Sequence, residues 1–227
     1  MARLLDDLLD MSRVTRNVVA LRREVLDLRG VVRQALEAVQ PLYRERAHRV
    51  VLSLPDEPVP VDGDPTRLQQ VLGNLLDNAI QYTPADGVIT IGVGDKPPTL
   101  VVSDTGPGIR EEDRDRIFER FQRGSDAKGL GSGLGLAIVR EIATLHGART
   151  LLYTPATGGT RVELRFCPLR IAAGRQIRQA RIAQRPPPDR RAVGGIAARV
   201  GQPLVRRGQF HPVFIYAIGR CVHHPEP

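Results

Sequence analysis

The sequence predicts an α/β domain with two layers, in which helices pack on one face of a mixed, mostly antiparallel sheet. Three observations lead to this prediction. Segments with apolar residues at helical spacing alternate with short segments rich in β-branched residues, and glycine-rich turns separate them. The 227 residues are enough for one well-buried domain with a smaller appendage, but not for two full-size domains.

The clearest helix is predicted to begin after Asp64. Aspartate is a favourable N-cap, and Pro65 suits the first helical position, where its missing N–H costs nothing. The apolar residues that follow form one stripe at helical spacing: Leu68, Val71, Leu72, Leu75, Leu76, Ala79 and Ile80. Asn74, Asn78 and Gln81 fall together on a flank of this stripe, so their polar ends can converge beside the core.

The chain before this helix is predicted to contain two further helical stretches and a strand. Residues 4–14 combine apolar residues near helical spacing with aspartates on the other side, which is typical of the end of an amphipathic helix. Residues 28–46 form the second helical stretch, and residues 48–54 are predicted to be a strand. Prolines and a glycine indicate a loop over residues 55–63.

The chain after this helix supplies most of the sheet. Residues 110–121 are predicted to form a charged helix, and residues 134–146 an apolar helix that Gly147 ends. The strands are predicted at the β-branched segments 88–93, 100–103, 148–153 and 160–166, of which the last two form a hairpin.

The positive net charge of +8 belongs to the C-terminal tail. From Cys167 onward the chain has 11 of its 33 basic residues and two of its 25 acidic residues, so the tail carries +9 and the remainder −1. This distribution argues against nucleic-acid binding by the body of the chain. No periodicity is sustained after Phe166, and the abundance of Arg, Pro and Gly predicts that residues 167–227 are largely disordered.

Cysteine usage and hydropathy predict a cytoplasmic location. The chain has two cysteines, Cys167 and Cys221, and no apolar N-terminal stretch preceded by basic residues. No segment approaches the roughly 20 apolar residues that a membrane helix needs. Association with a membrane would therefore require an additional N-terminal segment or a partner.

Two polar signatures have the chemistry of a nucleotide site. Asn74 and Asn78 lie one helical turn apart, and amide oxygens suit Mg²⁺, which also takes phosphate oxygens as ligands. Hydrogen bonding to neighbouring backbone is the alternative role for both. Asp104 follows a strand and precedes Gly106 and Gly108, which let a ligand lie against the backbone, and its carboxylate can accept the exocyclic amine of adenine. An ordinary Asp-Gly turn is the alternative there.

A third signature lies where a loop becomes a helix. Gly131, Gly133 and Gly135 leave backbone N–H groups and the helix dipole free to face phosphate. Their spacing resembles a dinucleotide fingerprint, but the preceding strand and the acidic residue about 20 positions later are missing. No Gly-x-x-x-x-Gly-Lys-Ser/Thr sequence occurs, which disfavours a P-loop enzyme.

Taken in order, these segments resemble the catalytic, ATP-binding domain of bacterial sensor histidine kinases, within the GHKL superfamily that also holds DNA gyrase. The resemblance covers about residues 1–166 and implies the Bergerat fold and transfer of the γ-phosphoryl of Mg·ATP to a histidine. It rests on five motifs: Asn74-Leu-Leu-Asp-Asn78-Ala-Ile-Gln-Tyr82 (N box), Asp104-Thr-Gly106-Pro-Gly108 (G1 box), Ile117-Phe-Glu-Arg-Phe121 (F box), Gly131-Ser-Gly133-Leu-Gly135 (G2 box) and Gly158-Gly159-Thr160 (last glycine motif).

The resemblance implies a role for each motif residue. Asn78 would be the principal Mg²⁺ ligand with Asn74 assisting, and Tyr82 would pack on the adenine while Asp104 accepts its amine. Arg123 would reach the γ-phosphate and act in catalysis with Asn74. The other residues implied to hold the nucleotide belong to the G1 and G2 boxes: Gly106, Gly108, Gly131, Ser132, Gly133, Leu134 and Gly135, with residues 123–132 as a lid over the phosphates.

Some positions depart from the family pattern or allow two interpretations. The family usually has Lys or Arg where this chain has Gln81, so one positive contact to phosphate is missing. Related ATPases have a glutamate general base at the position of Asn74; an amide takes no proton from water at neutral pH, which favours phosphotransfer over hydrolysis. For Phe118 and Phe121, packing into the core is at least as good an interpretation as ligand contact.

The resemblance also divides the chain. Residues 1–20 resemble the end of the second helix of the family's dimerisation and phosphotransfer hairpin, and residues 21–166 its catalytic domain. None of the five histidines lies in a sequence like the family's phosphoacceptor motif: His48, His146, His211, His223 and His224. We therefore expect a phosphotransfer histidine domain in trans, a downstream response regulator and at most a weak dimer.

Three other functions remain as alternatives. The first is an ATP-binding module without kinase output, and the second is a serine kinase of the anti-sigma type, against which the helix at residues 4–14 argues. The third is an Arg-rich nucleic-acid binder, with its binding confined to the tail. No specific nucleic-acid partner is expected for the body of the chain.

Overall fold

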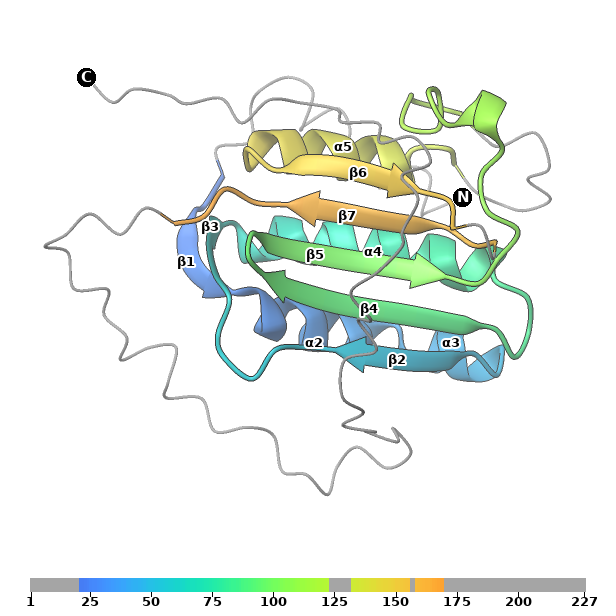
Figure 1. Ribbon diagram of the computed structural model, residues 1–227, viewed down its shortest axis with the longest axis horizontal. Coiled ribbons are helices and arrows are strands. Elements are labelled where there is room, and N and C mark those ends of the chain that lie inside the picture. Colours follow the sequence, from blue (N-terminus) through green and yellow to red (C-terminus); the bar gives the residue numbers. More distant parts are fainter. Residues whose placement is uncertain (1–20, 123–131, 156–157, 170–227) are drawn as a thin grey trace, which may run out of the picture.

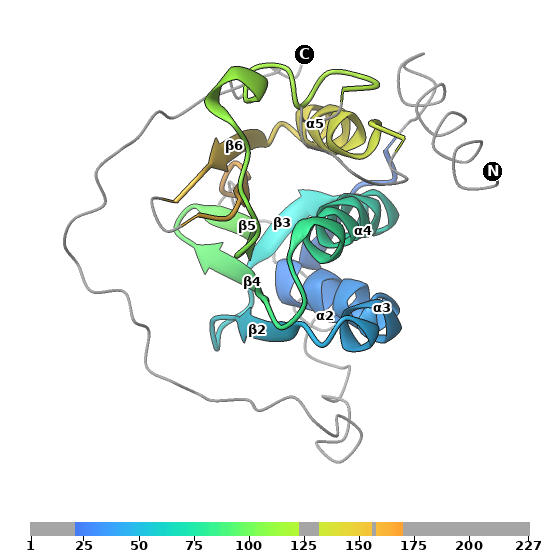
Figure 2. The ribbon, with the colours of Figure 1, turned by 90° about the vertical axis from the view of Figure 1, so that its right-hand side faces the viewer.

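The computed structural model describes residues 21–122, 132–155 and 158–169. A sheet forms one layer and the long helices form the other (Figures 1 and 2), which confirms the predicted two-layer architecture. Among the described residues, no helix has the length and apolar character needed to cross a membrane. The elements are β1 (Glu24–Asp27), α2 (Leu28–Ala38), α3 (Gln40–Glu45), β2 (Arg49–Ser53), β3 (Pro60–Gly63), α4 (Pro65–Tyr82), β4 (Val88–Asp95), β5 (Pro98–Asp104), η1 (Glu111–Asp113), α5 (Gly135–Leu145), β6 (Arg149–Tyr153) and β7 (Arg161–Arg165).

The main sheet has five strands in the order β2-β4-β5-β7-β6. Strand β2 runs parallel to β4, and all other neighbours are antiparallel, as predicted. The register pairs Asp104 with Ile89 and Ser103 with Arg161. The end of β5 therefore lies at the same edge of the sheet as the beginnings of β4 and β7.

Helix α4 is the central element of the helical layer (Figure 2). Its N-cap is Asp64, whose Oδ1 accepts hydrogen bonds from the N–H groups of Thr66 at 3.0 Å and Arg67 at 3.2 Å. Every residue of the predicted stripe is at most 6% exposed, and burying one Leu or Ile side chain stabilises a fold by about 1.5–3 kcal/mol. The stripe fixes the rotation of the helix and leaves three polar residues half-buried on its flank: Asn74, Asn78 and Gln81.

The structure corrects the predictions for the first third of the chain. Residues 28–46 form two helices rather than one, because Pro41 has no N–H for an interior helical bond and instead occupies the first turn of α3. Residues 60–63, predicted as loop, form β3, which pairs antiparallel with the unpredicted strand β1. Pro60 is tolerated because it begins a strand in a small, separate sheet, where few ladder bonds are needed.

The charged helix predicted over residues 110–121 is also wrong. Only the single 3₁₀ turn η1 forms, followed by turns, and Phe121 has a left-handed φ of 62°. Residues 110–116 are all charged, so the apolar residues of the segment are confined to its last turn and a longer helix would have no apolar face to bury. Phe118 packs into the core at 1% exposure, as one interpretation expected, whereas Phe121 is 63% exposed and does not.

Candidate functional site

The carboxylate of Asp104 lies at the end of β5, beside the last glycine motif. Its Oδ1 accepts hydrogen bonds from the N–H of Gly106 at 2.8 Å and the N–H of Thr160 at 3.3 Å. Burial raises the pKa of Asp104 above its ordinary value, and these two hydrogen bonds oppose the shift. The side chain is thus oriented by backbone groups and partly desolvated, which suits a carboxylate that must recognise a hydrogen-bond donor.

Glycines bring three chain segments into direct contact around this carboxylate. A Cβ at Gly159 would lie 2.0 Å from the carbonyl oxygen of Asp104, and a Cβ at Gly108 would lie 3.0 Å from the carbonyl oxygen of Gly159. A Cβ at Gly106 would lie 2.9 Å from the carbonyl oxygen of Tyr82, at the end of α4. The predicted N box, G1 box and last glycine motif therefore meet at one edge of the sheet.

The beginning of α5 joins this edge from the helical layer. A Cβ on Gly135, its first residue, would lie 3.6 Å from Oδ1 of Asn74 on α4. Among the described residues, no side chain caps the N-terminus of α5, so these residues leave its first N–H groups available to a ligand. Free N–H donors beside an amide are suited to hold phosphate oxygens.

The two chain segments that flank residues 123–131 also approach each other. A Cβ at Gly133, which has a φ of +71°, would lie 2.8 Å from the carbonyl carbon of Phe121. Ser132 is half-buried, and its Oγ accepts a hydrogen bond from the N–H of Leu134 at 3.3 Å. Leu134 is 1% exposed, and its side chain packs into the hydrophobic core. Arg123 and Gly131, two predicted site residues, lie outside the described residues.

The amides of α4 have the character expected of magnesium ligands. Asn74 and Asn78 are half-buried, and neither carboxamide forms a hydrogen bond with another described residue. Across the described ranges, no group of three or more His, Cys, Asp or Glu side chains could hold a metal ion. A magnesium ion at this site would therefore be held by neutral amide oxygens, water and the phosphates of its own ligand, which fits Mg²⁺. Tyr82, at the end of the same helix, is 39% exposed and available to stack.

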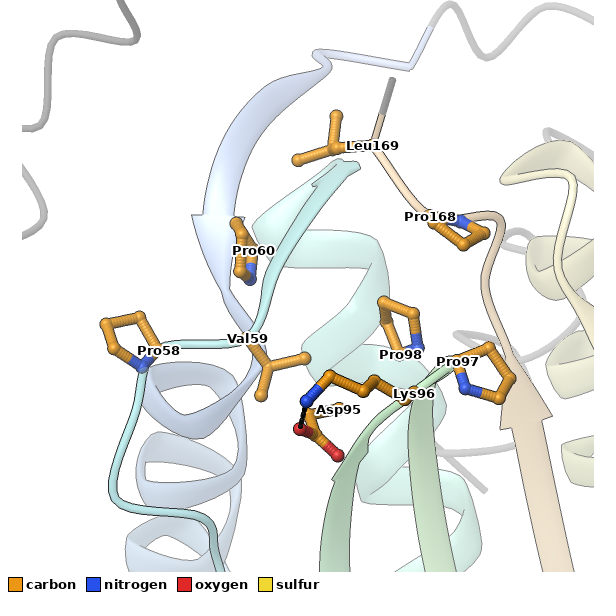
Figure 3. Close-up of a pocket in the computed structure, with 9 residues that line it drawn as sticks. All are labelled: Pro58, Val59, Pro60, Asp95, Lys96, Pro97, Pro98, Pro168 and Leu169. Carbon is orange, nitrogen blue, oxygen red and sulfur yellow. Dashed lines mark ion pairs between the residues drawn. The ribbon is translucent and has the colours of Figure 1, made fainter. Parts of the chain in front are cut away.

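A hollow on the described surface lies elsewhere and is not this site. It has a volume of ≈ 410 Å³ and is lined by Pro58, Val59, Pro60, Asp95, Lys96, Pro97, Pro98, Pro168 and Leu169 (Figure 3). Because β5 begins at Pro98 and ends at Asp104, the hollow is at the opposite edge of the sheet. Its charged side chains are Asp95 and Lys96, which pair with each other at 3.2 Å.

The geometry agrees with comparisons to known proteins. A model of the family "Histidine kinase-, DNA gyrase B-, and HSP90-like ATPase" matches residues 63–171. The solved structure of the mycobacterial sensor histidine kinase MprB is 32% identical and superposes with a TM-score of 0.56, covering 64% of this chain and 100% of that chain. This chain belongs to the family of histidine kinase-, DNA gyrase B- and HSP90-like ATPases.

Other members of the family extend the comparison. Histidine protein kinase DivJ of Caulobacter vibrioides is 33% identical over 167 residues, which are 72% of this chain and 28% of DivJ. The structure of full-length ShkA in complex with AMPPNP is 26% identical, with a TM-score of 0.63, and covers 74% of this chain and 36% of ShkA. The chain spans 11% of hybrid signal transduction histidine kinase D of Dictyostelium discoideum and 38% of adaptive-response sensory kinase SasA of Gloeothece citriformis. The matched region is an ATP-binding catalytic domain of the histidine kinase type.

Two residues of this ATPase-family domain contact a predicted site residue although they were not among the predicted site residues themselves. Gly159 and Thr160 contact Asp104 through backbone atoms. The Gly-Gly-Thr sequence was itself a signal for them. It could not indicate which residue they touch, because the contact joins segments more than 50 positions apart.

Proposed function

We propose that this chain binds Mg·ATP at the edge of the sheet formed by Asp104, Gly159 and the flank of α4, and that it transfers the γ-phosphoryl to a histidine. The observation that carries the proposal is the close approach of Gly135 to Asn74, where a Cβ on Gly135 would lie 3.6 Å from the amide oxygen. This close approach sets the N–H groups of a helix N-terminus beside Asn74, one helical turn from Asn78, and such an arrangement suits a metal-bound polyphosphate.

Each part of the proposed site has its own task. The carboxylate of Asp104 accepts the exocyclic amine of adenine, and Tyr82 stacks on the ring. The amides of Asn74 and Asn78 hold Mg²⁺, which neutralises phosphate charge when bound. The N–H groups at the start of α5 hold the phosphates, and Arg123 approaches the γ-phosphate. Phosphoryl transfer needs little more than such positioning and charge neutralisation.

Asn74 favours phosphotransfer over hydrolysis in this site. A carboxylate at that position could take a proton from an attacking water, but the neutral amide has no basicity at neutral pH. A histidine acceptor brings its own nucleophilic nitrogen and needs no such base. The partners that we propose are accordingly a phosphotransfer histidine domain and a response regulator that receives the phosphoryl group on an aspartate.

The test uses the full chain, radiolabelled ATP, Mg²⁺ and a separately produced phosphotransfer hairpin from a histidine kinase. We expect label on the hairpin, and no label when Asn78→Ala replaces the wild type. Exposed Thr66, in the first turn of α4, provides the control Thr66→Ala, which should retain transfer. Measurable ATP binding with no label on any hairpin would contradict the kinase function and favour an ATP-binding module without kinase output.

A further inference from the structure

The beginning of α4 and the end of α5 meet at a buried histidine. His146 follows the last residue of α5 and is 6% exposed. Its Nδ1 lies 2.8 Å from the carbonyl oxygen of Ile142, and its Nε2 lies 2.9 Å from the backbone nitrogen of Asp64. A carbonyl only accepts and a backbone N–H only donates. The ring must therefore be neutral with its proton on Nδ1, and it joins the two helices through Nε2.

The incoming N-terminal segment is attached at the same junction. The N–H of Arg22 donates to Oδ2 of Asp64 at 3.0 Å. The guanidinium of Arg23 bonds to Oδ2 of Asp62 at 3.1 Å and to the carbonyl oxygen of Leu145 at 2.6 Å. The chain that leads into the domain, the start of α4 and the end of α5 thus share one set of hydrogen bonds.

A second close approach of these two helices lies at the proposed nucleotide site. Gly135 and His146 are 11 positions apart along α5, and Asp64 and Asn74 are 10 positions apart along α4. At a rise of about 1.5 Å per residue, both spans are about 15–17 Å. The two antiparallel helices are therefore aligned by one pair of residues near each end of α5. An axial shift of α5 at His146 would displace Gly135 from Asn74.

We propose that His146 is a positioning residue for nucleotide binding: its neutral ring holds α5 in register on α4, and protonation of Nε2 releases that register. This inference rests on the proposed nucleotide site. A protonated Nε2 would point a donor at the N–H of Asp64, so the bond between the helices would be lost. The charged groups that face the ring are the carboxylates of Asp62 and Asp64, which favour protonation, and Arg23, which opposes it.

The electrostatic environment supports a neutral ring at pH 7. Burial lowers the pKa of His146 below its ordinary value of 6.5, with a further contribution from Arg23. Because the folded-state pKa lies below the unfolded one, the contribution of the ring to stability is fully present above pH 6.5. That contribution is lost as the pH falls through the lowered pKa.

The test compares the wild type with His146→Gln across pH. The amide oxygen of glutamine can accept from the N–H of Asp64, but it does not titrate. We would measure the dissociation constant for a non-hydrolysable ATP analogue with Mg²⁺ at pH 8 and at the lowest pH at which circular dichroism shows both proteins folded. Protonation of the ligand and of Asp104 affects both proteins equally, so it cancels in the ratio of their dissociation constants. We expect the wild type to lose at least about fivefold more affinity than the variant on acidification.

Matched variants distinguish positioning from general stability. Thr144 is exposed in the last turn of α5, and within the described part of the chain its hydroxyl donates only to the carbonyl oxygen of Arg140 in the same helix. Thr144→Ala should therefore follow the wild type at both pH values, whereas His146→Ala should bind more weakly even at pH 8. If the ratio of the two dissociation constants, wild type to His146→Gln, does not change with pH, this inference is overturned and the proposed function is not. A wild type that fails to bind nucleotide at pH 8 would overturn the proposed function and, with it, this inference.

Discussion

Gly159 lies so close to Asp104 that a Cβ at position 159 would be 2.0 Å from the carbonyl oxygen of the aspartate. Asp104 in turn donates its own N–H to the carbonyl oxygen of Thr160 at 2.9 Å. The adenine-binding carboxylate that we propose is therefore positioned by a segment from the far end of the domain. The position of this carboxylate therefore depends on the absence of a side chain at Gly159.

Gly159→Ala should unfold the edge of the sheet and abolish nucleotide binding. The added methyl group has no room, and the residue has a φ of +89°, at which an L-residue is strained. Gly147→Ala is the matched control, because Gly147 has a φ of +66° with no atom within 4 Å of the added Cβ. We expect the control to lose about 1–2 kcal/mol in unfolding free energy and to bind nucleotide normally. Normal ATP binding by Gly159→Ala in calorimetry would contradict the site geometry.

Asp104→Asn should weaken nucleotide binding without lowering the stability of the domain. Burial raises the folded-state pKa of Asp104 above 3.8, so its contribution to stability is present below that value and is lost as the pH rises through the folded-state pKa. The uncharged variant should therefore melt no lower than the wild type at pH 7. Its affinity for adenine nucleotides should nevertheless fall at least about tenfold, because a charge-assisted hydrogen bond is removed.

Thermal melting and a nucleotide titration at pH 7 check both outcomes for Asp104→Asn. A parallel titration with GTP tests base recognition, since an amide N–H₂ can donate to the carbonyl of guanine. Unchanged preference for ATP over GTP would show that another group reads the base.

Asn78→Ala should impair binding of the nucleotide only when magnesium is present. We expect the affinity for Mg·ATP to fall by about tenfold or more, and the affinity for ATP in excess chelator to change little, because the lost group is a metal ligand. Asn74→Ala should show the same pattern with a smaller loss. Titrations with and without Mg²⁺ measure the difference, and equal losses in both conditions would argue against a metal role.

Gln81→Lys should increase nucleotide affinity. Gln81 is half-buried on the same flank of α4 as the two asparagines, where a cation could reach the phosphates. A hydrogen bond to a charged group contributes about 1.5–3 kcal/mol, so we expect roughly a tenfold gain at low salt and a smaller gain in high salt. The control Thr144→Lys adds the same charge at the exposed, opposite end of α5. An equal gain from both variants would indicate a general charge effect.

Much of this arrangement is predictable because it depends on local sequence. The cap at Asp64, the apolar stripe of α4 and the glycine at position 147 act within a few residues, and the structure confirms each of them. The order of the glycine and asparagine motifs was sufficient to predict the family. The strands β1 and β3 were not predictable, because each depends on pairing with a segment more than 30 positions away.

The sequence alone determined that the chain has the fold of an ATP-binding kinase domain, since the apolar periodicity and the motif order are properties of the chain itself. Tertiary structure decided which residues are neighbours: Gly159 with Asp104, Gly135 with Asn74, and His146 with Asp64. It also decided that Phe118 is buried and Phe121 exposed. These outcomes depend on contacts between distant segments, whose geometry is fixed only when the sheet and the helices pack together.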